Sequence, residues 1–371
     1  MQPDAQTVAV TGAGGFIGRN LVVRLGELGF AVRPLTRETA RGEGEAALAG
    51  ADVVIHLAGA VRPSDPAEFA RTGDYVEWVA RAIAGGGRRP LVICASSVRA
   101  TDDTDYARSK RACEAALMGL AVDGHAVTAI YRLPNIFGKW ARPNYNSAVA
   151  TFCHNLARGL PIQVNDPAAA LSLIYIDDLI DQWAQLIARQ PRESGFITPT
   201  HMRDTSVGQV AETLRAFAGG RRAGQVNHVG VGLERALYAT FVSALPAEAF
   251  SYPLAAHTDP RGSFVEMLKT PESGQFSYFT AHPGVTRGGH YHHSKVEKFL
   301  IVHGQALFRF RNILNGELHQ VRACAAQPVV VETIPGWSHD VTNVGEDLMV
   351  SLIWANEVFD RERPDTVADP V

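Results

Sequence analysis

The fold of the N-terminal part is decided by the stretch Val8-Ala9-Val10-Thr11-Gly12-Ala13-Gly14-Gly15-Phe16-Ile17-Gly18, in which a short apolar run enters a glycine-rich loop. Gly12, Gly15 and Gly18 have GxxGxxG spacing. The first glycine permits a tight turn, the second lets backbone amides approach a pyrophosphate, and the third lets helix and strand pack closely. A helix N-terminus adds amide dipoles that favour phosphate. Because the loop joins a strand to a helix, it predicts a dinucleotide site. The residues predicted to contact the coenzyme here are Gly12, Gly15, Phe16, Ile17 and Gly18.

Short apolar runs alternate with longer amphipathic stretches through the first 135 residues. This alternation is typical of βαβ units, and it predicts an α/β, Rossmann-type, doubly wound parallel sheet covered by helices on both faces. The predicted strands are Val8–Val10, Val53–Leu57, Leu91–Ala95 and Val127–Tyr131, and the clearest helices are Phe16–Leu28 and Tyr106–Leu120.

The end of the second strand bears on the choice of coenzyme. The stretch 31–37 has no acidic residue for a ribose 2′-hydroxyl, but it contains Arg37, with Arg33 and Thr36 nearby. An arginine at this place accommodates a 2′-phosphate, so we predict NADPH rather than NADH, the alternative being a solvated surface arginine. After the third strand, Leu57 and Ala58 are expected to border the coenzyme.

A YxxxK motif, Tyr106-Ala107-Arg108-Ser109-Lys110, lies within a helical pattern. The i, i+4 spacing places the phenol and the ammonium on one helix face. An ammonium near a phenol favours the phenolate and eases proton transfer at neutral pH. Ser97 ends the fourth strand, where ligands of parallel sheets bind, and its hydroxyl could hydrogen-bond a carbonyl. Together these residues predict a reductase site with Ser97, Tyr106 and Lys110 as catalytic residues.

The hydrophobic pattern changes from about Gly262, where short strand-like segments follow one another and no long helical pattern separates them. This pattern predicts an all-β barrel or sandwich. We therefore expect a reductase domain over 1–245, a linker over 246–261 and a β domain over 262–371. The predicted strands are Gln275–Thr280, Lys298–Val302, Ala306–Arg311, Val329–Thr333 and Leu348–Trp354.

Histidines and a glutamate in the β domain have the spacing of a metal site. Gly284 is followed by His290-Tyr291-His292, Glu297 and Gly304, and Pro335-Gly336-Trp337-Ser338-His339 comes later. These stretches resemble the two motifs of the cupin superfamily, a family of metal-binding jelly-roll barrels. Three imidazoles and a carboxylate suit a divalent transition metal without selecting among zinc, iron, manganese and nickel. We predict His290, His292, Glu297 and His339 as ligands, against a metal-free barrel that uses these histidines in acid–base chemistry or serves dimerisation.

Composition narrows the class of protein. Of 371 residues, 46% are hydrophobic and 20% charged, as in globular proteins, and the net charge of -3 gives no general basic field for nucleic acid. The four cysteines are scattered singly, which is typical of reduced cysteines in a cytoplasmic protein. There is no signal-peptide pattern and no spanning apolar run, so we expect no membrane association.

The glycine loop, YxxxK motif and strand-end serine resemble the extended short-chain dehydrogenase/reductase family over roughly residues 6–245. The resemblance implies that Tyr106 donates a proton, that Lys110 tunes it and holds the coenzyme ribose, and that Ser97 orients the carbonyl. It also implies that Asn135, in Tyr131–Gly138, contacts the diphosphate of a nucleotide sugar. Arg142 and Asn144, in the polar loop Arg142–Ser147, are predicted to help hold that substrate, although a purely structural turn is an open alternative.

Across the whole chain, the sequence is similar to the CapF/WbjC-type enzymes of capsular and O-antigen polysaccharide synthesis. The matching stretches include Phe137–Trp140, Arg142–Ser147, Pro161–Asp166, Tyr175–Asp178, Thr258–Phe264 and Trp354–Asp360. The resemblance implies a homodimer, zinc, and a bifunctional role on the route to UDP-N-acetyl-L-fucosamine. The cupin would epimerise C3 of a UDP-2-acetamido-2,6-dideoxy-4-hexulose, and the N-terminal domain would reduce the C4 ketone with NADPH. The base that removes the C3 proton is open between His293, Lys298 and a hydroxide on the metal.

Three other functions remain possible at this stage. The chain could be a sugar-nucleotide reductase whose cupin only dimerises or stabilises it, which the retained ligand set disfavours. It could be a non-catalytic NADPH-sensing scaffold, which Ser97, Tyr106 and Lys110 disfavour. It could also be a redox-neutral 4-epimerase that keeps NAD bound.

Overall fold

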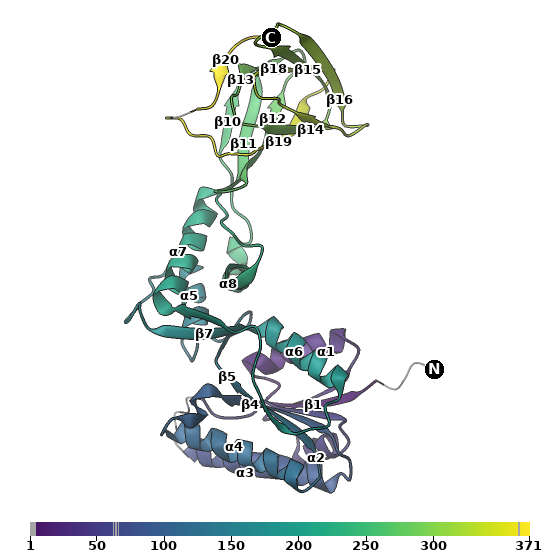
Figure 1. The fold of residues 1–371 in the computed structure, drawn as a ribbon, viewed down its shortest axis with the longest axis vertical. Coiled ribbons are helices and arrows are strands. Elements are labelled where there is room, and N and C mark those ends of the chain that lie inside the picture. The colour runs from purple at the N-terminus through teal and green to yellow at the C-terminus, as the bar shows by residue number, and fades with distance from the viewer. Residues whose placement is uncertain (1–4, 62, 64, 66, 363) are drawn as a thin grey trace. The chain divides into compact units, whose positions relative to one another are not determined.

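The computed structural model describes residues 5–61, 63, 65, 67–362 and 364–371. The chain forms two compact units (Figure 1), Met1–Arg215 with Val231–Pro246, and Ala216–Gly230 with Ala247–Val371. This division differs from the sequence-based domains, since 216–230 group with the second unit. The backbone explains this grouping: Lys269 N donates to Gly224 O at 2.7 Å, and Val226 N donates to Lys269 O at 2.8 Å.

The first unit is built on a six-stranded, all-parallel sheet with the order β2-β1-β3-β4-β5-β8. The four predicted strands are present, each within two residues of its expected ends. The bounds are β1 Thr7–Thr11, β2 Ala31–Leu35, β3 Val53–His56, β4 Leu91–Ser97, β5 Val127–Leu133 and β8 Gly195–Ile197.

Helices cover both faces of this sheet (Figure 1), because successive strand residues point to opposite sides. Val8 and Val10 pack in a core with α1 and α6, whereas Ala9 packs in a second core with α2, α3 and α4. The doubly wound α/β prediction is thereby confirmed for this unit. The helix bounds are α1 Phe16–Glu27, α2 Arg41–Ala49, α3 Ala67–Gly85, α4 Asp105–Val122 and α6 Ile176–Arg189.

The strand order reverses at β1, which has β2 on one side and β3 on the other. In open α/β sheets, ligands bind beyond the carboxyl ends of the strands at such a switch point. The glycine loop follows β1 at this edge, and Leu57 follows β3.

Beyond β5 the chain forms a small sheet with the order β6-β7-β9, in which β9 is antiparallel to β7. These strands were not predicted from the sequence. The remaining elements are β6 Asn135–Phe137, β7 Ala170–Tyr175, β9 Arg203–Ser206, α5 Ala148–Leu156, α7 Val207–Ala223 and α8 Gly232–Ser243, with the 3-10 helices η1 Val98–Thr101 and η2 Ala247–Ala249. Within the described chain, none of the helices has the length and apolarity needed to cross a bilayer.

The second unit consists of two antiparallel sheets. One has the order β10-β11-β12-β19-β14-β17 and the other β16-β15-β18-β13-β20. Strand β10 falls within the stretch expected to be a linker, and it pairs with β11. The strand bounds are β10 Ala256–Asp259, β11 Gly262–Thr270, β12 Gly274–Ala281, β13 Thr286–Tyr291, β14 Glu297–His303, β15 Gln305–Asn312, β16 Leu318–Cys324, β17 Val330–Glu332, β18 Trp337–Asn343, β19 Met349–Ala355 and β20 Val367–Ala368.

Aromatic side chains from both sheets form one core. Phe279 and Phe299 of the first sheet pack with Phe308 and Phe310 of the second. Phe299 lies edge-on to both Phe279 and Phe308, a favoured arrangement for aromatic pairs. The histidines described below come from β13, β18 and the segment that follows β13.

Candidate functional site

The glycine loop leaves no room for larger residues at two of its positions. Gly12 has a φ of +70°, and a Cβ there would lie 2.8 Å from Ala58 N. A Cβ on Gly18 would lie 2.4 Å from Gly12 O. Gly15 caps α1, which begins at Phe16. The roles assigned to the first and third glycines, a tight turn and close packing, therefore match their surroundings.

A buried pair, not anticipated from the sequence, fixes the ends of β1 and β3. Thr11 Oγ1 lies 2.9 Å from His56 Nδ1, and it accepts the backbone N–H of Leu57 at 3.2 Å. Both side chains are fully or almost fully buried. The loops that border the predicted coenzyme site are thus tied to each other.

A cavity of about 640 Å³ opens at this edge of the sheet, a volume within the usual range for small-molecule sites. It joins the glycine loop to the YxxxK motif and to the segment after β5. Predicted site residues that line it are Gly12, Gly15, Phe16, Ile17, Gly18, Leu57, Ser97, Tyr106, Lys110, Asn135 and Arg142.

Tyr106 and Lys110 lie in the first turns of α4. Thr104 caps this helix by accepting the N–H of Ala107 at 3.1 Å. Lys110 Nζ donates to Ala95 O at 3.0 Å and lies 5.9 Å from the centre of the Tyr106 ring. Ser97 ends β4 and accepts the N–H of Arg99 at 3.2 Å. The three side chains therefore border one cavity, as a carbonyl reductase requires.

Glu114, one turn beyond Lys110 on α4, adds a buried charge that the sequence analysis did not single out. Its carboxylate accepts Arg132 Nε at 2.9 Å, Arg132 Nη2 at 2.7 Å and Ser96 Oγ at 2.5 Å. Burial would raise the pKa of Glu114, but these hydrogen bonds and Lys110 lower it below its usual value. An ionised carboxylate thus joins α4 to β4 and β5 behind the predicted catalytic residues.

Three predicted contact residues are not among the described residues that line the cavity. The Arg37 side chain is 93% exposed, and its Nη2 lies 3.8 Å from a carboxylate oxygen of Glu68. Asn144 is exposed, has a φ of +53°, and its backbone N–H donates to Thr151 Oγ1. The N–H of Ala58 approaches Thr11 Oγ1 at 3.4 Å. Roles for these three residues stay predictions.

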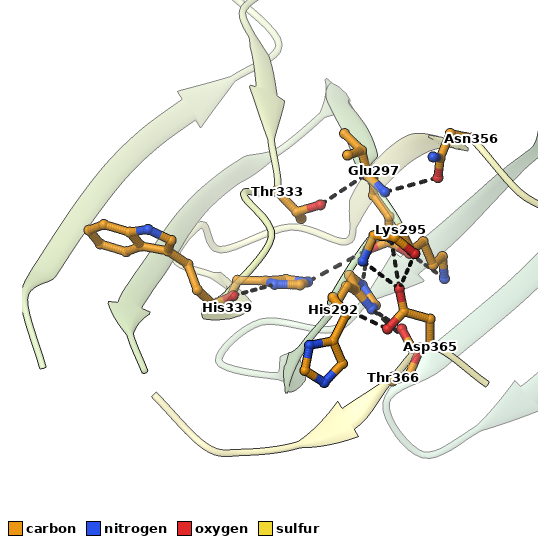
Figure 2. Close-up of polar contacts among 12 residues, drawn as sticks. His292, Lys295, Glu297, Thr333, His339, Asn356, Asp365 and Thr366 are labelled. Carbon is orange, nitrogen blue, oxygen red and sulfur yellow. Dashed lines mark hydrogen bonds and ion pairs between the residues drawn. The ribbon is translucent and has the colours of Figure 1, made fainter. Parts of the chain in front are cut away.

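The four predicted metal ligands converge in the second unit. Their ligand atoms all lie within 4.8 Å of one another. His290 lies on β13 opposite His339 of β18, His292 follows β13, and Glu297 begins β14. Figure 2 shows His292, Glu297 and His339 in this cluster, with Lys295 and Asp365 beside them.

The spacing of these atoms fits a tetrahedral ion. Glu297 Oε2 lies 3.4 Å from His292 Nε2 and 3.6 Å from His339 Nε2. Two ligand atoms that are each about 2.1 Å from a tetrahedral ion lie about 3.4 Å apart. Both Nε2 atoms are buried and have no hydrogen-bond partner among the described residues, a costly state that a bound metal would relieve. The residues present therefore fit a divalent metal.

The ionisation of the cluster also suits metal binding. Burial, together with the neighbouring His339, lowers the pKa of His290 to about 4. Burial would raise the pKa of Glu297, but His292, His339 and Lys295 hold it well below its usual value. Near neutral pH the cluster thus offers a carboxylate and a neutral imidazole, the forms that bind metals.

Lys295 is a buried residue of this site that sequence reasoning missed. Its side chain is 9% exposed, and its Nζ lies 2.9 Å from Glu297 Oε1. The two candidate bases lie elsewhere: Lys298 pairs with Glu332, and His293 is exposed with its ring against Tyr291. The K-x-E spacing of Lys295 and Glu297 was the available signal, since it places both side chains on one side of an extended segment.

Comparison with known proteins gives a consistent assignment. Residues 8–195 match the NAD dependent epimerase/dehydratase family, and residues 257–367 match the polysaccharide biosynthesis C-terminal domain. A Pseudomonas aeruginosa protein, UDP-2-acetamido-2,6-beta-L-arabino-hexul-4-ose reductase, is 49% identical over 97% of this chain and 98% of its own.

Solved structures agree with the sequence match. The crystal structure of the capsular polysaccharide assembling protein CapF from Staphylococcus aureus is 37% identical, covers 98% of this chain and 100% of its own, and has a TM-score of 0.91. RMD from P. aeruginosa, solved with NADPH, shares the fold of the first unit at 17% identity, with a TM-score of 0.53 over 65% of this chain and 97% of its own. The chain therefore belongs to the family of CapF-type nucleotide-sugar reductases, which join an NAD dependent epimerase/dehydratase domain to a polysaccharide biosynthesis C-terminal domain.

Proposed function

We propose that this protein is a bifunctional enzyme of UDP-N-acetyl-L-fucosamine synthesis for capsule or O-antigen. The metal centre of its second unit epimerises C3 of a UDP-2-acetamido-2,6-dideoxy-4-hexulose, and the first unit reduces the C4 ketone. The observation that carries this proposal is the presence, in one chain, of two complete constellations. One is Ser97, Tyr106 and Lys110 beside a glycine-lined cavity, and the other is a four-residue metal-ligand cluster. The 49% identical relative supports the substrate class.

The residues of the cavity have distinct roles in the reduction. The hydroxyl of Ser97 donates a hydrogen bond to the C4 oxygen and orients the carbonyl. Tyr106 delivers a proton to the same oxygen as the ketone becomes an alcohol. Lys110, held by Ala95 O at 3.0 Å, keeps its ammonium beside the phenol and reaches the ribose of the coenzyme. Asn135 and Arg142, which line the cavity, bind the diphosphate of the sugar nucleotide.

NADPH is the proposed coenzyme, and it supplies the hydride that C4 receives. The glycine loop and the N-terminus of α1 hold its pyrophosphate. Ala13 N donates to Leu35 O at 3.2 Å, which brings the end of β2 beside the loop. We propose that Arg37, two residues further on and 93% exposed, pairs with a 2′-phosphate at the surface.

The second unit is proposed to be a cupin jelly roll that binds zinc through His290, His292, Glu297 and His339. A bound divalent metal supplies Lewis acidity, which makes the proton alpha to a ketone easier to remove. The ammonium of Lys295, 2.9 Å from Glu297, offsets the charge of that carboxylate in a buried site. Removal of the C3 proton from one face and its return to the other inverts that carbon. A homodimer and a cytoplasmic location complete the proposal.

Proton NMR in deuterated water tests both activities on the UDP-4-ketosugar. Wild-type protein should place deuterium at C3 without NADPH and should give the C4 alcohol when NADPH is added. Tyr106→Phe should retain the exchange at C3 and lose the reduction, whereas His290→Ala should lose the exchange. Because the two variants alter separate sites, each serves as the control for the other.

The outcomes separate the competing functions. Exchange at C3 that survives in His290→Ala would leave a reductase with a structural β domain. Neither exchange nor reduction in wild type would favour a scaffold that senses NADPH. Tightly bound NAD with inversion at C4 and no consumption of NADPH would indicate a redox-neutral epimerase. Any of these three results contradicts the bifunctional proposal.

A further inference from the structure

The C-terminal strap, residues 365–370, contacts the segment that carries the metal ligands. Asp365 accepts backbone N–H groups through both carboxylate oxygens: Oδ1 from His293 at 2.8 Å, and Oδ2 from Ser294 at 2.7 Å and Lys295 at 2.8 Å. It also accepts Ser294 Oγ at 2.9 Å. One side chain thus holds three consecutive amides of the loop between His292 and Glu297.

The backbone of the strap also orients a ligand directly. Asp365 O lies 2.5 Å from His292 Nδ1, and Figure 2 shows Asp365 and Thr366 beside that ring. A carbonyl oxygen only accepts, so Nδ1 carries the proton and Nε2 keeps its lone pair. This is the tautomer that would bind a metal through Nε2, which is the buried atom without a partner.

The rest of the strap joins the strands that hold the other two histidines. Strand β20 pairs with β13, where Ala368 lies opposite His290. Ser338, next to His339, donates its hydroxyl to Asp369 O, and Arg311 Nη2 reaches Asp369 Oδ2 at 2.8 Å. The strap therefore contacts each segment that carries a predicted ligand, either at the ligand itself or at a residue beside it.

We propose that Asp365 is a positioning residue for the metal centre, and that the C-terminal strap sets the metal affinity of this site without supplying a ligand. Partners that orient a metal-binding histidine and fix its tautomer commonly contribute tenfold or more to affinity. Here the orienting carbonyl and the carboxylate that holds the ligand loop belong to the same residue. The inference rests on the proposed metal centre.

The test measures Zn²⁺ affinity of the full-length protein by competition with a chromogenic chelator. Asp365→Ala removes both acceptor oxygens of the side chain. Asp365→Asn keeps one acceptor oxygen but replaces the other with an NH2 group, which cannot accept from the backbone N–H groups. Asp360→Ala is the matched control. Asp360 is an acid near the strap whose carboxylate, among the described residues, accepts the N–H of Glu362 close by and holds no part of the ligand loop. We expect Asp365→Ala to weaken Zn²⁺ binding by about 10- to 100-fold, Asp365→Asn to do so less, and the control to match wild type.

Two further measurements distinguish positioning from a merely structural role. The melting temperature of the metal-free variants should stay near that of wild type, and the visible absorption of Co²⁺-loaded Asp365→Asn should differ from that of Co²⁺-loaded wild type. Zn²⁺ affinity equal to wild type in Asp365→Ala would overturn the inference. The inference would also be overturned if a variant lost Zn²⁺ affinity only because its metal-free form was already unfolded. Failure of wild type itself to bind Zn²⁺ would instead refute the proposed metal centre, and with it the role of the strap.

Discussion

Replacing Gly18 by alanine tests how closely helix α1 must approach the glycine loop. A Cβ at this position would lie 2.4 Å from Gly12 O and 2.7 Å from Ala13 Cα, both backbone atoms, whereas ordinary contacts begin near 3.4 Å. The helix and loop must therefore separate by about 1 Å, and overpacking of this kind costs about 1–3 kcal/mol. If the separation displaces the amides that face the pyrophosphate, the same free energy corresponds to a roughly 5- to 150-fold weaker coenzyme complex.

The dissociation constant for NADPH, measured by fluorescence titration, is the decisive quantity. Gly26→Ala is the matched control, since Gly26 lies on the same helix and a Cβ there would meet no atom of the described residues within 4 Å beyond its chain neighbours and the adjoining turns of its own helix. That variant should bind NADPH like wild type and should be more stable in urea by about 0.5–1 kcal/mol, because alanine favours helix. Equal NADPH affinities for Gly18→Ala and Gly26→Ala would refute the assignment of this loop to the coenzyme.

Three other expectations follow from the same structure. Arg37→Ala should reduce the preference for NADPH over NADH about tenfold, measured as the ratio of the two dissociation constants, because a lost charge contact to phosphate contributes about 1–2 kcal/mol; an unchanged ratio would contradict its assignment to the 2′-phosphate. The pKa of Glu114 is lowered in the folded protein, where the bonds from Arg132 and Ser96 outweigh burial. The contribution of Glu114 to folding stability is therefore complete above the pKa that it has in the unfolded chain. It is lost as the pH falls through its lower pKa in the folded protein. The difference in unfolding free energy between wild type and Glu114→Gln should be larger at about pH 7 than at about pH 4, and a difference that grows on acidification would be the wrong sign. Removing metal with a chelator should lower the melting temperature of the second unit, since metal at about 100 times its dissociation constant stabilises by about 2.7 kcal/mol. Glu297→Gln should abolish that response, and a chelator effect that persists in this variant would place the metal elsewhere.

Patterns that are local in sequence predicted much of this molecule. The strands β1, β3, β4 and β5 are continuous apolar runs, buried on both faces, so that hydrophobicity alone reveals them. The histidine motif was equally informative, because three of its members lie in the short segment from His290 to Glu297 and the fourth, His339, lies on β18, which pairs with β13. In each case, the spacing of the residues along the sequence indicates how they lie relative to one another in the folded unit.

The supporting residues could not be predicted in this way. Asp365 lies 73 residues from His292, and Glu114 lies 18 residues from Ser96, so their contacts exist only once the fold has formed. Neither acid belongs to a spacing pattern, and an isolated aspartate or glutamate in a sequence is most often a solvated surface residue. Two strands of the small sheet, β6 and β9, were missed for a related reason, because strands of three or four residues carry too few alternations to be recognised.

Residues 216–230 belong to the second unit although residues of the first unit precede and follow them in the chain, and this has a practical consequence for preparing the two units as separate fragments. The chain passes from one unit to the other three times, after Arg215, Gly230 and Pro246, and α7 runs without interruption through the first of these crossings. A single protease cut therefore cannot separate the two units cleanly, because at least one of the two fragments carries residues of both units. A gene truncated at Pro246 would encode a reductase fragment in which Gly224 and Val226 have lost Lys269 as their hydrogen-bond partner. The boundary predicted from the sequence is thus a poor place to cut, and the two units are interleaved along the gene instead of being placed end to end.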